Sequence, residues 1–216
     1  MIPDWDSERQ NMVETQLRRR GIRDPRVLAA MGQIPREAFV PPEARVASYQ
    51  DAPVYIGWGQ TISQPYMTAL MAELLDLEGS ETVLDVGAGS GYHAAVLGAL
   101  AARVVSVEIV PALAAIAADN LARSGYGGNV TVVVGDGSAG WPEGAPYNAI
   151  SVAAGAPEVP PALLDQLAQP GRLVIPVGPM EDQELLVIHK KADGAIDRHV
   201  AGYCRFVPLR GGGGWR

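Results

Sequence analysis

The chain has 216 residues, of which 48% are hydrophobic and 19% charged, and its formal net charge is −7. A chain of this length and composition can bury a sizeable core without a disulfide or a structural metal. The single cysteine, Cys204, excludes an internal disulfide, no Cys/His cluster has zinc-site spacing, and the acidic balance disfavours a protein that binds nucleic-acid phosphates.

The N-terminus has neither the basic region nor the apolar region of a signal peptide, and no apolar run is long enough to span a membrane. With one cysteine, the chain suits a reducing compartment. We therefore expect a cytoplasmic protein that does not contact membranes.

The first eighty residues predict helices joined by irregular segments. A helix is expected from Ser7, as its cap, to Arg20, with Gly21 as its stop. The pair Asp24-Pro25 begins a second, short helix, and prolines 35, 41 and 42 keep the chain irregular after it. A third helix is expected from Pro65 to Leu77, where apolar residues recur at helical spacing.

From Thr82 onward, strands and helices alternate, which predicts right-handed βαβ units and a parallel sheet covered on both faces. The expected strands are 83–86, 104–107, 130–134, 147–153 and 172–177, and the expected helices are 92–100, 111–123 and 161–169. After Pro179 two strands, 184–189 and 195–206, follow each other without a helix, which predicts an antiparallel strand near one edge. The fold class is therefore α/β, with a doubly wound, seven-stranded, mostly parallel sheet preceded by helices.

A glycine-rich loop, Gly87-Ala88-Gly89-Ser90-Gly91, joins the first of these strands to a helix, where an open α/β sheet binds its ligand. Its G-x-G-x-G spacing differs from the G-x-G-x-x-G of a dinucleotide site, which weakens a nicotinamide-cofactor interpretation without removing it. Glu108 ends the next strand, where a carboxylate can bind both hydroxyls of a ribose. Asp136, in Gly135-Asp136-Gly137, stands where an acid could meet an adenine amino group, although simple turn chemistry also explains it.

Together these features resemble the class I S-adenosylmethionine-dependent methyltransferases, whose fold is Rossmann-like. The segment Gly59-Gln60-Thr61-Ile62-Ser63-Gln64-Pro65-Tyr66-Met67 is more specific, and it resembles the signature of the protein-L-isoaspartate O-methyltransferases. Residues 34–41 and 205–209 are similar to that family as well. The resemblance runs from about residue 7 to residue 209, with Asn148 standing where the family usually has aspartate.

The resemblance implies transfer of a methyl group from S-adenosyl-L-methionine to the α-carboxylate of L-isoaspartyl residues in damaged proteins, which then return to aspartate through a succinimide. It implies no metal. It assigns Ser63 as the catalytic residue and Thr61, Ile62 and Ser63 to the substrate. The implied cofactor-binding residues are Gly87, Gly89, Gly91, Glu108, Asp136 and Gly137. We expect one domain, residues 1–209, with a substrate-side segment 1–80 and a cofactor-binding sheet 81–209, a flexible tail 210–216, and a monomer.

Other interpretations remain at this point. Ser63 could instead cap the helix that begins at Pro65. The chain could be a nucleic-acid methyltransferase, although the strand ending near Ala153 lacks an Asn/Asp-Pro-Pro-Tyr motif. It could modify one dedicated biosynthetic peptide, or hold the cofactor without catalysis. The basic cluster Arg18-Arg19-Arg20 with Arg23 is interpreted as a solvated helix end in preference to an RNA-binding patch.

Overall fold

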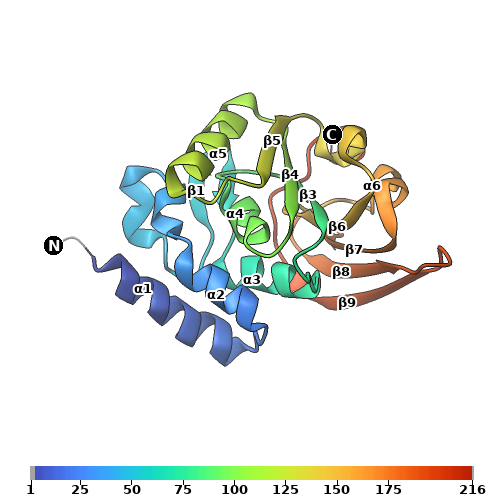
Figure 1. Cartoon of the computed structure of the whole chain (residues 1–216). Helices are drawn as coiled ribbons and strands as arrows, with labels where there is room; N and C mark the ends of the chain where they lie inside the picture. The colour runs from blue at the N-terminus through green and yellow to red at the C-terminus, as the bar shows by residue number, and fades with distance from the viewer. Residues whose placement is uncertain (1–2, 216) are drawn as a thin grey trace.

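A computed structural model describes residues 3–215 and contains a seven-stranded sheet in the order β5-β4-β3-β6-β7-β8-β9 (Figure 1). The strands are β3 (Thr82–Val86), β4 (Arg103–Glu108), β5 (Val130–Val134), β6 (Tyr147–Val152), β7 (Leu167–Val177), β8 (Gln183–Lys190) and β9 (Ile196–Cys204). Strands β3 to β7 pair in parallel, and β8 is antiparallel to both of its neighbours. This confirms the predicted fold class, including the antiparallel strand near the edge.

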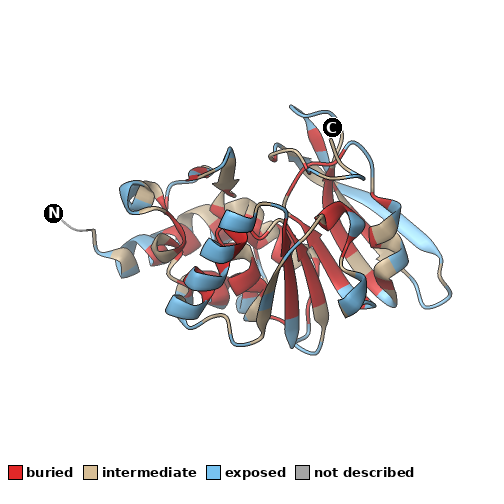
Figure 2. Ribbon diagram, turned by 90° about the horizontal axis from the view of Figure 1, so that it is seen from above, coloured by how far each residue is buried: buried red, intermediate tan, exposed pale blue. Residues whose placement is uncertain are grey.

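Alternating side chains divide the buried residues of the sheet between two cores. Val83 and Val104 point to the face covered by α1 (Trp5–Met12), α2 (Pro25–Gln33), α3 (Pro65–Leu74), α4 (Tyr92–Gly98) and α5 (Pro111–Ser124). Leu84 and Val105 point to the other face, where α6 (Pro161–Gln166) packs. Figure 2 shows the central strands buried between these layers.

The first helix differs from the prediction at its start. Its cap is Asp4, whose carboxylate accepts hydrogen bonds from the backbone and hydroxyl of Ser7, so Ser7 lies inside the helix. The helix continues through a π-helical turn, η1 (Val13–Leu17), and a 3₁₀ turn, η2 (Arg18–Arg20), before it ends at Gly21 with φ +105°. The second helix begins as predicted, because Asp24 accepts from the backbone N–H of Arg26 at 2.7 Å.

The stretch that prolines 35, 41 and 42 were expected to keep irregular contains two 3₁₀ turns, η3 (Arg36–Phe39) and η4 (Pro42–Ala47). A hairpin follows, formed by β1 (Val54–Gly57) and β2 (Gln60–Ile62), which the sequence analysis did not predict. The helix expected over 65–77 ends at Leu74, and β7 begins at Leu167, earlier than expected. Two further 3₁₀ turns, η5 (Gly137–Ala139) and η6 (Pro142–Gly144), lie between β5 and β6.

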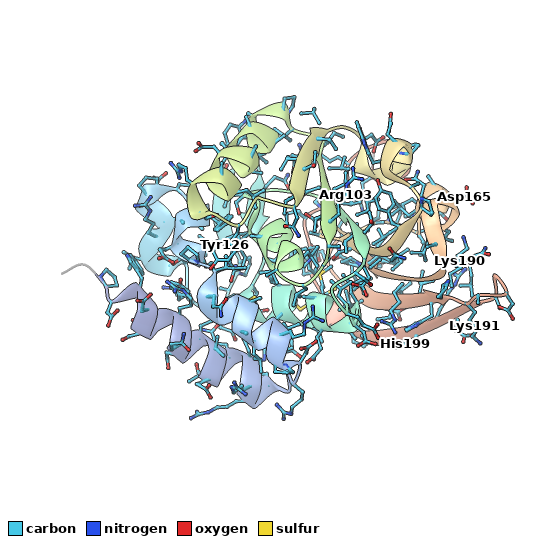
Figure 3. The ribbon with its side chains drawn as sticks, in the orientation of Figure 1. Arg103, Tyr126, Asp165, Lys190, Lys191 and His199 are labelled. Carbon is cyan, nitrogen blue, oxygen red and sulfur yellow. The ribbon has the colours of Figure 1, made fainter. Side chains whose placement is uncertain are left out.

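The last two strands of the sheet, β8 and β9, carry several polar and charged side chains. His189 and His199 stack with ring centroids 5.7 Å apart, and Lys191 pairs with Asp197 at 2.7 Å. Figure 3 labels Lys190, Lys191 and His199 along this edge. Within residues 3–215, no helix has the length and apolar character needed to cross a membrane.

Candidate active site

Parallel pairing brings three chain segments together at the carboxyl ends of the strands. Strands β3 and β5 flank β4, so the glycine loop after Val86, Glu108 at the end of β4, and Gly137 after β5 all reach one edge of the sheet. Ligands of open α/β sheets bind at this edge. The topology therefore places most of the predicted cofactor residues around one cavity.

The glycine loop is fastened to the end of β4 by its own backbone. The N–H groups of Gly87 and Ala88 donate to the carbonyl of Val107 at 2.9 and 3.2 Å, and the N–H of Gly89 donates to Glu108 Oε2 at 2.9 Å. Gly91, which the sequence also assigns to the cofactor, does not line the cavity. A Cβ at Gly91 would lie 3.0 Å from the carbonyl oxygen of Ala117, so this glycine lets the loop and α4 approach α5.

Glu108 is held in place with acceptor capacity to spare. Glu108 is only 5% exposed. Its Oε2 accepts from the N–H of Gly89, and its Oε1 accepts from the N–H of Val110 at 3.0 Å. Each carboxylate oxygen has further lone pairs, and Glu108 lines the cavity. A fixed, ionisable carboxylate at this position fits a vicinal diol such as that of a ribose.

The cavity has a volume of about 770 Å³, including its part open to solvent. Beneath the glycine loop, Asp85 is fully buried, its Oδ2 accepts from Ser106 Oγ at 2.6 Å, and among residues 3–215 no hydrogen bond reaches its Oδ1. Burial, which outweighs the opposing hydrogen bond from Ser106 and is aided by the charge of Glu108, raises the pKa of Asp85 to about 7. The cavity itself is lined by Gly87 and Gly89, which let a ligand approach the backbone, and by Glu108, whose carboxylate suits a ribose diol, so the residues present fit S-adenosylmethionine.

A second cavity, of about 1140 Å³, adjoins the first. The two share four lining residues, which are Thr61, Ser63, Ala153 and Val207. The second cavity is otherwise walled by α3 and by the chain from β9 onward, including Tyr66, Cys204 and Arg205. The two cavities therefore meet at these four residues, where a substrate in the second could approach a ligand in the first.

Strand alternation explains how the Thr61-Ile62-Ser63 segment is arranged. Ile62 is 5% exposed and lines only the first cavity, whereas Thr61 and Ser63 line both. The carbonyl of Ser63 accepts from Arg36 Nη2 at 2.7 Å, and no hydrogen bond among the described residues occupies its Oγ. The alternative role of Ser63 as a helix cap is not supported, because the N-cap of α3 is Gln64, which makes no side-chain capping bond.

Asp136 and Gly137 are adjacent, but only Gly137 lines the first cavity. Gly137 lines the first cavity, and a Cβ there would lie 2.5 Å from Val86 Cγ1, so only glycine fits. Asp136 does not line the cavity, and its Oδ1 instead accepts from the N–H and Oγ of Ser138 at 2.9 and 2.6 Å. Burial alone would raise the pKa of Asp136, but hydrogen bonds from Ser138 and from the backbone of Gly212 lower it.

Three residues near the site were not assigned a role there from the sequence. His93 lines the first cavity and its Nε2 lies 2.9 Å from Ser151 Oγ, while burial lowers its pKa to about 4. Arg36 is fully buried behind Ser63. Arg20 lines the second cavity, pairs with Asp51 at 2.9 Å and lies 3.7 Å from the centre of the Tyr66 ring, so it is more than a solvated helix end.

Comparisons with known proteins agree with this arrangement. The family described as Protein-L-isoaspartate(D-aspartate) O-methyltransferase matches residues 7–213. A protein-L-isoaspartate O-methyltransferase of Methanoculleus marisnigri is 53% identical over 209 residues, covering 97% of this chain and 94% of that relative. One of Marinobacter nauticus is 55% identical over 213 residues, covering 98% and 97%.

Two solved structures share the fold over nearly the whole chain. One named as a protein-L-isoaspartate O-methyltransferase has a TM-score of 0.81 and 32% identity, with 95% of this chain and 66% of that chain covered. The other, from Plasmodium falciparum and described as a complex with S-adenosyl-L-homocysteine, has a TM-score of 0.77 and 31% identity over 94% of this chain and 98% of that one. The chain therefore belongs to the protein-L-isoaspartate(D-aspartate) O-methyltransferase family.

Proposed function

We propose that the chain transfers the methyl group of S-adenosyl-L-methionine to the α-carboxylate of L-isoaspartyl residues in damaged proteins and peptides. The observation that supports this assignment is the junction of the two cavities at Thr61 and Ser63. One cavity is lined by the glycine loop and by Glu108, whose carboxylate suits a ribose diol, and the adjoining one is open to solvent and so accessible to a substrate. The methyl ester then closes to a succinimide, whose hydrolysis returns part of the residue to aspartate.

The reaction requires little acid–base catalysis from the protein. A carboxylate is already ionised at pH 7, so no general base has to remove a proton from the nucleophile. The cofactor supplies a methyl group activated by its sulfonium. His93 is present at the cavity wall, but its lowered pKa keeps it uncharged near neutrality, which avoids adding a positive charge beside a cationic ligand.

What the protein supplies is alignment. The Ser63 hydroxyl has no partner among the described residues and faces both cavities, so it is available to donate a hydrogen bond to one oxygen of the substrate carboxylate. Arg36 fixes the Ser63 backbone, and Thr61, two residues earlier, lines the same two cavities. In well-oriented reactions, positioning contributes effective molarities of about 10⁵–10⁸ M, so a donor that orients the nucleophile has a direct effect on rate.

The substrate assignment is tested with two peptides that differ only in an aspartyl or an isoaspartyl linkage, incubated with labelled S-adenosylmethionine. We expect label on the isoaspartyl peptide alone. Equal labelling of both peptides, or labelling of neither, would contradict the proposal. Labelling confined to one dedicated peptide sequence would identify a biosynthetic modifier instead of a repair enzyme.

The role of Ser63 is tested by Ser63→Ala, with Ser124→Ala on α5 as the matched control, because Ser124 Oγ only bonds the carbonyl of Leu121. Loss of a hydrogen bond to a charged group costs about 1.5–3 kcal/mol, so kcat for Ser63→Ala should fall about 10- to 100-fold. Cofactor affinity should stay unchanged in both variants. If Ser63→Ala turned over at the wild-type rate at saturating peptide, the Ser63 hydroxyl would have no role in the reaction.

We further propose that the enzyme works as a monomer in the cytoplasm on many protein clients. Both cavities are lined by one chain, and the free Cys204 suits a reducing compartment. Sedimentation at equilibrium tests the monomer, and a dimer mass would contradict it.

A further inference from the structure

Residues 211–215, here called the glycine segment, fold back onto the turn that carries Asp136. The N–H of Gly212 donates to Asp136 Oδ2 at 2.8 Å, and the N–H of Gly213 donates to Ser138 Oγ at 2.9 Å. Figure 1 shows this end of the chain beside the turn that follows β5. The sequence predicts a flexible tail here, whereas in the structure hydrogen bonds from two backbone N–H groups attach the segment to the acidic turn.

The glycine segment packs closely against its neighbours. Gly211 has φ +129°, and a Cβ there would lie 1.9 Å from Asp136 Oδ1, while a Cβ at Gly214 would lie 2.1 Å from the carbonyl oxygen of Leu209. Real Cβ atoms do not approach other atoms so closely, so any side chain at either position would displace the segment. The glycines at 211 and 214 are therefore explained by close contact and not by flexibility alone.

Trp215 fixes the far end of the glycine segment. Its indole Nε1 donates to the carbonyl of Gly155 at 3.0 Å, and its backbone N–H donates to the carbonyl of Leu209 at 2.8 Å. Leu209 in turn donates its own N–H to Gly155 at 2.8 Å. The segment is thus held at both ends, by the chain after β6 and by the acidic turn after β5.

The turn that the segment grips is part of the cofactor site. Gly137, between Asp136 and Ser138, lines the cofactor cavity, as do Leu209 and Arg210 immediately before the segment. Ser138 bonds Asp136 Oδ1 while Gly212 bonds Oδ2, so both carboxylate oxygens are oriented and the turn has little freedom to move. A turn fixed before ligand arrives loses less entropy on binding, which favours affinity.

We propose that the glycine segment is a positioning element for the cofactor, which holds Asp136, Gly137 and Ser138 in the geometry that binds S-adenosylmethionine. The proposal rests on the cofactor of the assigned function and is independent of the peptide substrate. A test by ligand binding therefore separates its failure from a failure of the isoaspartyl assignment.

The matched pair for this test is Gly212→Pro and Gly212→Ala. Proline removes the N–H that binds Asp136, whereas alanine keeps it and its Cβ would lie at an ordinary 3.7 Å from Asp136 Oδ2. We expect the dissociation constant for S-adenosylhomocysteine, measured calorimetrically, to rise about tenfold for Gly212→Pro and to stay within about twofold for Gly212→Ala. In turnover, KM for the cofactor should rise with the dissociation constant, while kcat and KM for peptide at saturating cofactor stay near wild type.

A second variant covers the case in which Gly212→Pro fails to fold. A chain ending at Arg210 lacks the whole segment, and we expect it to show the same loss of cofactor affinity with a near-normal melting temperature in the absence of ligand. Wild-type affinity in either variant would overturn the proposal. Tighter binding would overturn it as well, because it would mean that the segment competes with the cofactor for the turn.

Discussion

At the scale of single residues, the positions of the glycine loop and of the acid at the end of β4 were predictable from the sequence. The glycine loop and Glu108 could be placed from spacing alone, since parallel neighbours end at one edge. Asn148, the departure from the family's aspartate, is also explained. Its side-chain oxygen accepts from the N–H of Thr82 at 2.9 Å, a bond that an amide oxygen makes as well as a carboxylate does.

Glu108→Gln tests the diol-binding assignment. Glutamine keeps one acceptor oxygen but turns an N–H₂ group toward either the Gly89 or the Val110 N–H, so a bond that now orients the side chain becomes a repulsion. We expect the dissociation constant for S-adenosylhomocysteine to rise about 10- to 100-fold. Glu8→Gln, on the exposed side of α1, is the control and should bind as wild type. Unchanged affinity in Glu108→Gln would refute a direct contact with the cofactor.

Asp85 predicts an unusual pH dependence for the ligand-free protein. Its pKa of about 7 in the folded state lies above the ordinary value of 3.8, so between these values the folded protein keeps a proton that the unfolded chain has lost. Raising the pH through this window therefore lowers the free energy of unfolding, by up to about 4 kcal/mol. Asp85→Asn removes this loss and keeps an acceptor for Ser106.

The measurement is urea unfolding of wild type and Asp85→Asn at pH 5 and pH 8. The lowered pKa of His93 makes the free energy of unfolding rise with pH in the acidic range. This effect is the same in wild type and variant, so it cancels when their free energies of unfolding are subtracted. The variant should gain stability relative to wild type as the pH rises. Parallel pH profiles would show that Asp85 is ionised in the folded state across this range.

At the scale of elements, long periodic segments were predicted and short or non-local ones were not. The hairpin of β1 and β2 has strands of four and three residues, too short for alternation to be visible, and its turn holds Trp58 at φ +51°, which no sequence rule anticipates for tryptophan. The bond from Arg36 to Ser63 joins residues 27 positions apart, so only the folded chain reveals it. These are the parts of the site that lie on the substrate side.

Arg36→Lys tests whether the 3₁₀ turn η3 positions Ser63. The guanidinium donates to the carbonyls of Ser48 and Ser63 at 2.6 and 2.7 Å, and an ammonium group cannot reproduce that fork. We expect kcat to fall about tenfold with cofactor affinity nearly unchanged. Arg26→Lys is the control, because Arg26 bonds the carbonyls of Leu77 and Leu100 and so costs stability without touching Ser63. Equal effects of both variants on kcat would mean that Arg36 acts only through overall stability.

At the scale of the whole molecule, the substrate-side segment and the cofactor-binding sheet share one core. Met12 and Phe39 from the first eighty residues lie in the same buried cluster as Val83, Leu97 and Val174 from the sheet and its helices. The cofactor cavity crosses this boundary too, since Thr61 and Ile62 line it together with Gly87 and Glu108. Residues 1–80 and 81–209 are therefore not expected to unfold separately.

Calorimetry tests this expectation. We expect a single unfolding transition, and because both segments line the cofactor cavity, S-adenosylhomocysteine at 100 times its dissociation constant should stabilise the whole chain by about 2.7 kcal/mol. For a chain of this size that corresponds to a rise in melting temperature of about 5–10 °C in the same single transition. Two resolved transitions, of which the ligand moved only one, would show that the segments form separate cooperative units.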